Sequence, residues 1–346
     1  MAGASRTSGD LTAAGGAVAD ATEPSSATGS VSTGGAATGG AAIVSRRTAA
    51  AFLVLVVILW GANWPIMKVG LQSISPLSFT ALRIVLALAV MTALAAVLGQ
   101  LRLPDRRDLP IILSTGLLAM AGLMGLVNVA LQFVDAGRAA VLIYTAPLWV
   151  TPLAAIVLHE RLTRVRAAGL VVGIAGVAVL FNPLGFDWDD PDVVLGNALL
   201  LIAAIGWAVQ IVHVRAHTWR GTPFQLFPWQ LGLAAVVVLP IAFILEFGQP
   251  IDWTWPLPAI VLYTGLVATA FCYWAVITVN RALPAMTTAL LMLGVPVAGV
   301  LFSSLAFGEP LDATTVAGLA LIVTGLAAVA LGERAAAQDP DLQSSR

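Results

Sequence analysis

The sequence predicts an all-α membrane protein in which ten transmembrane helices form two inverted five-helix repeats. Hydrophobic residues make up 59% of the chain and charged residues 10%, whereas about a quarter of the residues in soluble domains are charged. Apolar runs of about twenty residues, each long enough to cross a ~30 Å hydrocarbon core, recur along the chain. Arginines fall in alternate connections, and the second half of the sequence repeats features of the first.

The apolar runs set the bounds of the predicted helices, and turn residues such as Ser75-Pro76 and Thr222-Pro223 mark the connections. No soluble domain needs so many apolar segments of this length. The predicted spans are 48–70, 76–98, 109–132, 138–159, 165–182, 194–216, 223–246, 256–280, 284–307 and 312–332.

Two tails flank the predicted helices. Residues 1–45 are mostly Gly, Ala, Ser and Thr, and such a segment cannot bury enough apolar surface to offset the entropy of ordering it. We therefore predict a disordered tail there, and a second tail at 333–346. The first tail lacks the basic start and apolar stretch of a signal peptide.

The distribution of arginine predicts the orientation of the chain. Arginine precedes the first helix and follows every even-numbered helix, whereas the alternate connections hold almost none and the connection 183–193 is acidic. Because basic residues stay on the cytoplasmic side, both termini are predicted to be cytoplasmic and 183–193 external. Five helices per half then place the second half upside down relative to the first, as in transporters that give alternating access.

The repeat itself is visible as matched residues at one offset of about 149 positions. Single prolines or glycines could match by chance, but several at one offset indicate a duplication, with halves at 46–182 and 194–332. The matched pairs are Pro147/Pro296, Glu160/Glu309, Gly169/Gly318 and Gly176/Gly325. A tryptophan and a carboxamide three residues apart, which share one helical face, also recur as Trp60/Asn63 and Trp207/Gln210.

Several segments are similar to one known family. They are WGANWPIMKVG in the first helix, LSFTALRIVLA in the second, PLWVTPLAAIVLHERLTRVRAAGLVVGIAGVAVL around the first glutamate, and PVAGVLFSSLAFGEPLDATTVAGLALIVTG around the second. Over about 48–332 the chain resembles the EamA family of the drug/metabolite transporter superfamily. The resemblance implies a bacterial inner-membrane carrier that often exports amino acids, related solutes or drugs. His159-Glu160 departs from the family's usual Gly-Glu, which Gly308-Glu309 keeps.

Polar and aromatic side chains within the spans predict a central substrate cavity. Because lipid surrounds the bundle, such groups should turn inward, where they either line a cavity or form hydrogen bonds between helices. The predicted substrate-binding residues are Trp60, Asn63, Trp64, Asn128, Gln132, Tyr144, Thr145, Trp207, Gln210, Tyr273, Trp274 and Thr288.

Charged residues and prolines supply further candidates. Arg83 lies inside the second helix, where a charge is costly unless it faces the interior or a partner; it would attract a substrate carboxylate or bind backbone carbonyls. Glu160 and Glu309 would serve gating or proton coupling, or cap the helix that follows each. Pro147 and Pro296 interrupt backbone hydrogen bonding and are candidate hinges.

Other functional classes find little support in the sequence. There is no nucleotide-binding Gly-Lys-Ser/Thr loop, Cys272 is alone, and His213 and His217 have no evident third metal ligand. We predict a secondary transporter for a small organic solute, without cofactor, metal or nucleic-acid partner. The protein would contact membrane lipids, and the sequence does not decide whether it forms a homodimer. The alternatives are a lipid or polyprenyl-phosphate flippase and, behind it, a membrane-embedded enzyme.

Overall fold

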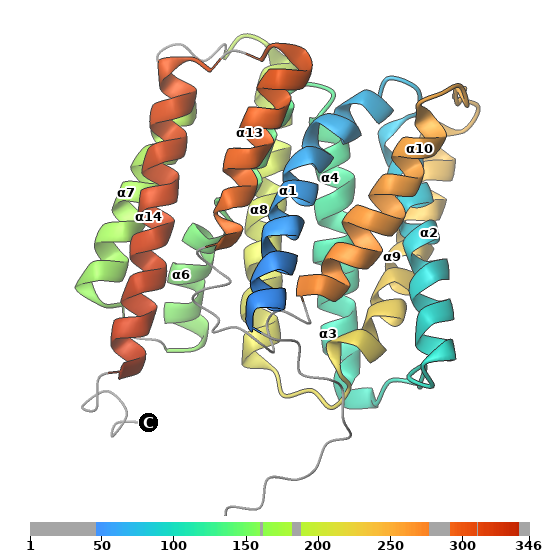
Figure 1. Ribbon diagram of the computed structural model, residues 1–346, viewed down its shortest axis with the longest axis horizontal. Coiled ribbons are helices and arrows are strands. Elements are labelled where there is room, and N and C mark those ends of the chain that lie inside the picture. The colour runs from blue at the N-terminus through green and yellow to red at the C-terminus, as the bar shows by residue number, and fades with distance from the viewer. Residues whose placement is uncertain (1–45, 160–161, 182–187, 277–290, 310, 339–346) are drawn as a thin grey trace, which may run out of the picture. The chain divides into compact units, whose positions relative to one another are not determined.

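The computed structural model describes residues 46–159, 162–181, 188–276, 291–309 and 311–338, and these contain helices and connections but no strand (Figure 1). The elements are α1 (Arg46–Gly70), α2 (Pro76–Val97), η1 (Arg106–Asp108), α3 (Leu109–Ser114), η2 (Thr115–Gly122), α4 (Leu123–Ala130), α5 (Ala136–Ile143), α6 (Ala146–Val157), α7 (Arg164–Phe181), α8 (Pro191–Ala216), α9 (Pro223–Glu246), α10 (Leu257–Leu262), η3 (Tyr263–Phe271), α13 (Gly294–Phe307) and α14 (Ala313–Gln338).

The predicted all-α membrane fold is confirmed. Eight helical segments of the described chain are long and apolar enough to cross a membrane. Three of them are composite: η1 to α4, α5 with α6, and α10 with η3 each form one span. The shorter helices α7 and α13 lie at two further predicted spans. The count of ten stays a prediction, because residues 277–290, which precede α13, lie outside the described residues.

Two π-helical segments occupy corresponding places in the two halves. η2 begins at Thr115 and η3 at Tyr263, close to the offset of the sequence repeat. In η3 the Thr269 hydroxyl donates to the Thr264 carbonyl, at 2.7 Å, and so occupies one of the backbone acceptors of the widened turn. Such widened turns are frequent at functional sites because they redirect the side chains that follow.

Matching breaks interrupt two other helices. The segment predicted as one helix over 138–159 is broken at Tyr144-Thr145, and α6 restarts with Pro147 in its first turn. A turn at Leu293 likewise precedes α13, whose first turn contains Pro296. Proline is tolerated in a first turn because its missing N–H has no partner there. Each proline therefore lies at a helix start rather than at a mid-helix kink.

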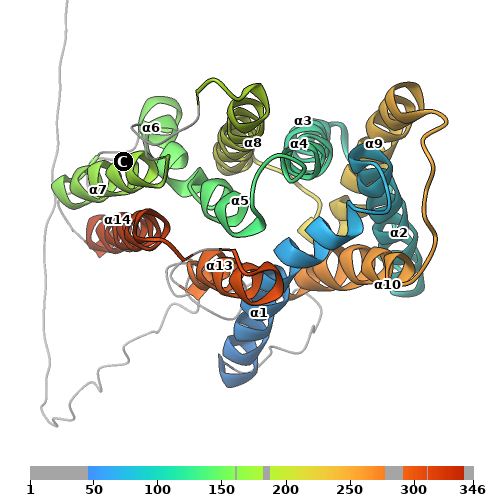
Figure 2. The same cartoon turned by 90° about the horizontal axis from the view of Figure 1, so that it is seen from above.

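The helices α7 and α14 pack side by side through glycines (Figures 1 and 2). A Cβ built on Gly325 would lie 2.5 Å from the Gly173 backbone nitrogen, and one on Gly169 would lie 2.7 Å from the Gly325 oxygen. No larger residue fits at this separation, so the small residues set the distance between the two helices.

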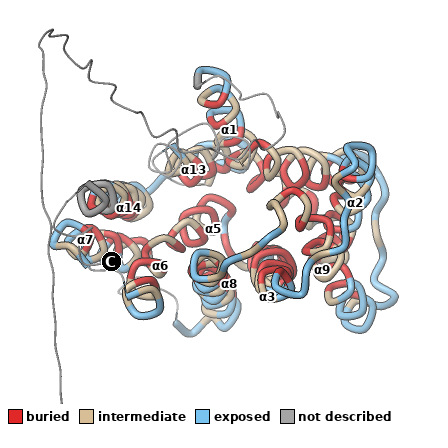
Figure 3. Tube along the Cα trace, turned by 90° about the horizontal axis from the view of Figure 1, so that it is seen from below, coloured by how far each residue is buried: buried red, intermediate tan, exposed pale blue. Residues whose placement is uncertain are grey.

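Burial follows the contacts between helices. Buried residues lie where helices meet, and exposed residues lie on the outer sides of the helices (Figure 3). Many of the exposed side chains are large and apolar, such as Val171, Val236 and Ile244. Such a surface suits hydrocarbon rather than water.

Candidate functional site

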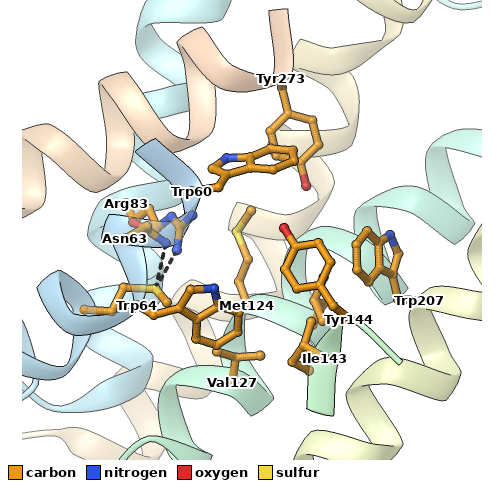
Figure 4. Close-up of a pocket in the computed structure, with 12 residues that line it drawn as sticks. Trp60, Asn63, Trp64, Arg83, Met124, Val127, Ile143, Tyr144, Trp207 and Tyr273 are labelled. Carbon is orange, nitrogen blue, oxygen red and sulfur yellow. Dashed lines mark hydrogen bonds between the residues drawn. The ribbon is translucent and has the colours of Figure 1, made fainter. Parts of the chain in front are cut away.

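A cavity of about 100 Å³ lies among residues from both halves of the chain (Figure 4). Helices α1, α2, α4, α5 and α8 contribute to it, together with the break after α5 and the segment that follows η3. The lining residues are Trp60, Asn63, Trp64, Met67, Arg83, Leu123, Met124, Val127, Ile143, Tyr144, Trp207 and Tyr273.

Helix α1 presents one face to this cavity. Trp60, Asn63, Trp64 and Met67 have the spacing i, i+3, i+4, i+7, which places them on one side of a helix. The Trp60 indole Nε1 donates to the Ala268 carbonyl at 2.7 Å. This carbonyl lies in η3, so the bond fixes α1 against the π-helical segment.

Arg83 places a buried guanidinium at the cavity wall. Arg83 as a whole is 6% exposed. Nε donates to the Thr269 hydroxyl at 2.8 Å, and Nη1 donates to the Met67 sulfur at 3.1 Å. Among the described residues no carboxylate forms a salt bridge with it. A buried charge without a counter-ion is costly, so this position favours an anionic ligand group.

Asn63 adds a second donor beside Arg83. Its Nδ2 donates to the same Met67 sulfur at 3.2 Å, and its buried Oδ1 has no hydrogen-bond partner. Figure 4 shows both donors converging on this sulfur. A thioether is a weak acceptor, whereas a carboxylate accepts strong, charge-assisted hydrogen bonds. A carboxylate in the place of this sulfur would therefore satisfy both donors better.

Aromatic pairs form the remaining walls. Trp60 and Tyr273 meet edge to face with ring centroids 5.6 Å apart, and Tyr144 and Trp207 do so at 5.9 Å. The hydroxyls of the two tyrosines point into the space between these pairs (Figure 4). Such a lining suits a small molecule that has an apolar body and a polar end.

Of the predicted substrate-binding residues, six line the cavity together with Arg83. They are Trp60, Asn63, Trp64, Tyr144, Trp207 and Tyr273.

Other predicted residues form contacts between helices instead. Asn128 donates to the Thr80 hydroxyl at 2.7 Å and Gln210 donates to the Thr115 hydroxyl at 3.0 Å. The Trp274 ring meets the Phe52 ring edge to face, with centroids 5.9 Å apart. In each case the helix rotation directs the side chain to a neighbour rather than to the cavity.

The last three predicted residues lie elsewhere. The Thr145 hydroxyl donates to the Leu142 carbonyl at 2.6 Å, within the break between α5 and α6. Gln132 is exposed. Thr288 lies outside the described residues.

Sequence reasoning missed five apolar lining residues, Met67, Leu123, Met124, Val127 and Ile143. Met67 could have been found, since it continues the face of Trp60 and Asn63 by one turn. The others carry no polar signal and resemble ordinary core residues.

The interpretation that Glu309 caps the helix following it is wrong. Its carboxylate accepts from the backbone N–H groups of Ala136 and Gly137, both at 2.9 Å, at the start of α5. Lys68 lies 3.7 Å from Glu309 and 3.1 Å from Asp135. The following helix, α14, is capped by Asp312, which accepts from the Thr315 N–H at 2.8 Å. Glu309 therefore joins the two halves; Glu160 lies outside the described residues.

A second carboxylate joins the halves at the opposite end of the bundle. Asp108 accepts from the backbone N–H groups of Arg220 and Gly221, at 2.7 and 3.1 Å, just before α9. Nearby, the His213 and His217 rings stack at 5.7 Å. Across the described ranges no group of three side chains could hold a metal ion.

Comparison with known proteins gives one consistent result. The EamA-like transporter family matches residues 47–182 and again 194–331. A Bacillus subtilis protein named "Uncharacterized transporter YoaV" is 28% identical over 79% of this chain and 94% of its own length.

Two further relatives carry names that state a cargo. A Streptantibioticus cattleyicolor protein, "Probable terminal-alkyne amino-acid exporter", is 30% identical over 83% of this chain and 96% of its own length. A Salmonella typhimurium protein, "Probable amino-acid metabolite efflux pump", is 29% identical over 79% and 91%. One solved crystal structure covers 84% of this chain and 100% of its own, with 25% identity and a TM-score of 0.57.

Proposed function

Because the chain belongs to the EamA-like transporter family, we propose that it exports a small carboxylate-bearing metabolite, amino-acid-like or drug-like, across the bacterial inner membrane. The chain is a multi-pass membrane transporter. The names of two relatives, an amino-acid exporter and an amino-acid metabolite efflux pump, support this cargo and the outward direction.

The observation that carries the proposed cargo is the shared weak acceptor in the cavity. Arg83 and Asn63 both donate to the Met67 sulfur, and a carboxylate would satisfy both donors better. The aromatic walls beside them suit an apolar or aromatic side chain. The substrate would therefore lie with its carboxylate toward α1 and α2 and its side chain among the rings.

Contacts between the halves at both ends of the bundle support alternating access. Glu309 joins the halves at one end and Asp108 at the other. Opening either contact by rocking one half against the other would admit substrate from one side only. We assign the Glu309 end to the outside, as the arginine distribution predicts.

The groups that line the cavity disfavour a lipid flippase. Arg83 is the one cationic side chain among the residues that line the cavity, whereas binding a lipid phosphate would need several cationic side chains.

Thermal unfolding of the detergent-purified protein tests the cargo with matched probes: phenylalanine, 3-phenylpropionate and phenethylamine. A ligand that binds the native state raises the midpoint as it saturates the site. We expect the two carboxylates to raise it and the amine, which lacks the carboxylate, to leave it unchanged. Equal shifts from all three probes would remove the basis for a carboxylate site.

Two variants make the test specific to the site. Arg83→Gln should abolish the shift while Arg83→Lys keeps part of it, because only the second retains a charge. Met67→Leu should keep the shift, since the sulfur is displaced by the ligand. The direction is tested with a radiolabelled form of the probe that raises the midpoint. Lower accumulation in cells that express the protein than in cells that lack it would establish export, and higher accumulation would contradict it.

A further inference from the structure

A second, larger hollow lies on the outer side of the bundle. It measures about 860 Å³ and lies between α2, α9, α10 and the connection 247–256. That connection passes outside α2 (Figure 2). Its walls include Val85, Phe243 and Leu262, which are 40%, 66% and 51% exposed. Apolar side chains that are exposed on a membrane protein face lipid tails, so the hollow is a groove accessible from the bilayer.

The length of the groove matches one leaflet. On α2 it runs from Ser78 to Ala89, which at 1.5 Å per residue is about 16 Å. A hydrocarbon core of ~30 Å contains two leaflets. The groove therefore accommodates one acyl chain and ends near the membrane midplane.

Polar groups occur only at the end where α2 begins. Ser78, Glu246 and Gln249 line that end, and the half-exposed Trp253 lies beside them. Tryptophan at such a depth is typical of the membrane interface. The groove thus has a polar mouth at the interface and an apolar interior, which is the polarity of a lipid.

The charge of the mouth selects among headgroups. Glu246 lines the mouth, Asp252 lies in the adjoining connection, and no basic residue occurs between Leu239 and Leu262. On the α2 side the one basic residue, Arg83, faces the central cavity instead. Without a cation for a surplus negative charge, the mouth disfavours anionic lipids and suits an ammonium group near the carboxylates.

We propose that this groove binds one phosphatidylethanolamine molecule, with an acyl chain between α2 and α9 and its ammonium group near Glu246. The leaflet is the outer one, given the orientation proposed above. Helix α2 belongs to the first family match and α9 and α10 to the second. The lipid therefore bridges the two halves at the place where Glu246 accepts from the Leu77 and Ser78 N–H groups, at 2.9 and 2.7 Å, and from the Ser75 and Ser78 hydroxyls, at 2.6 and 2.7 Å.

Photocrosslinking tests this site in the full-length protein. The probe is phosphatidylethanolamine with a diazirine at the end of one acyl chain, diluted into phosphatidylcholine vesicles that contain the protein. After irradiation, mass spectrometry locates the adducts. Because the diazirine is at the end of the acyl chain, we expect them to concentrate at the apolar end of the groove, in 82–89, 239–243 and 261–262. The same probe with a phosphatidylglycerol headgroup should give at least about threefold less adduct there.

A groove-filling variant and a matched control complete the test. Ala89→Trp occupies the deep end of the groove and should lower the adduct yield at least about threefold. Ala93→Trp adds the same side chain one turn further along α2, beyond the groove, and should leave the yield unchanged. Adducts spread evenly over all exposed helices, or insensitive to Ala89→Trp, would overturn the site. Equal labelling by both headgroups would overturn the ammonium selectivity.

Discussion

His159 and Gly308 occupy equivalent positions in the two repeats, and both have a left-handed backbone, with φ of 54° and 66°. Each lies directly before a glutamate of the repeat, Glu160 or Glu309. Glycine adopts this conformation without the steric cost that a Cβ imposes. Histidine in place of glycine before Glu160 therefore leaves the left-handed turn unchanged, but His159 bears the steric cost of this conformation.

This relationship predicts that His159→Gly stabilises the protein. Relief of the left-handed strain should outweigh the larger entropy of glycine in the unfolded chain, for a gain of up to about 1 kcal/mol. Thermal unfolding in detergent measures it. Gly308→His is the mirror control and should destabilise by a similar amount. An unchanged or lower midpoint for His159→Gly would show that the imidazole makes a compensating contact.

The sequence predicted well those features that depend on helix periodicity. Apolar length located the helices, and spacing placed Trp60, Asn63 and Trp64 on one face of α1. Lipid outside the bundle turned polar groups inward, as expected. Whether an inward residue reaches the cavity depends on a few tens of degrees of rotation. Neighbours therefore differ: Tyr273 lines the cavity, whereas Trp274 packs against Phe52.

Two kinds of feature lay beyond sequence reasoning. The partner of Glu309 lies far away in the chain, at Ala136 and Gly137, and no local pattern encodes that pairing. The π-helical segments shift the register of every residue that follows them. A strict 3.6-residue period therefore misplaces side chains after Thr115, which is where Met124 enters the cavity.

Glycine substitutions should separate close packing from helix propensity. Gly325→Ala places a methyl group 2.5 Å from the Gly173 nitrogen, so α7 and α14 must move apart, and we expect a loss of at least about 2 kcal/mol. Gly206→Ala has no atom within 4 Å and should stabilise by about 0.5–1 kcal/mol, because alanine favours the helix. Thermal unfolding of both variants measures the contrast; a small effect at Gly325 would contradict direct packing.

The cap of α14 should make stability depend on pH. Hydrogen bonds from Thr315, and further from the Thr314 hydroxyl, hold the pKa of the Asp312 carboxyl below its ordinary value. A depressed pKa means that this stabilisation is present above the unfolded pKa of about 3.9 and is lost as the pH falls through the folded value.

Asp312→Ala should therefore cost about 1 kcal/mol at neutral pH, the usual value of an N-cap. The difference between variant and wild type should shrink below about pH 4, as the wild-type carboxyl becomes protonated. Unfolding midpoints across this range measure the effect. A difference that stays constant with pH would show that the ionised carboxylate is not the stabilising group.

Glu309 should keep the outer side of the cavity closed. Glu309→Ala leaves the Ala136 and Gly137 N–H groups without their acceptor and removes the partner that lies 3.7 Å from Lys68. Leaving buried donors unpaired costs about 1–3 kcal/mol each, and this cost falls on the closed state alone. The population of the open state should rise accordingly.

A single thiol reports on this opening. Cys272→Ala removes the one native cysteine, and Met124→Cys places a thiol in the cavity wall. A membrane-impermeant maleimide added outside should label this thiol at least about fivefold faster with Glu309→Ala, since fivefold corresponds to roughly 1 kcal/mol. Asp190→Ala is the matched control: it removes a carboxylate that caps α8 on the same predicted side of the membrane and whose hydrogen bonds stay within its own segment. Equal rates for both variants would mean that Glu309 anchors α5 without controlling access.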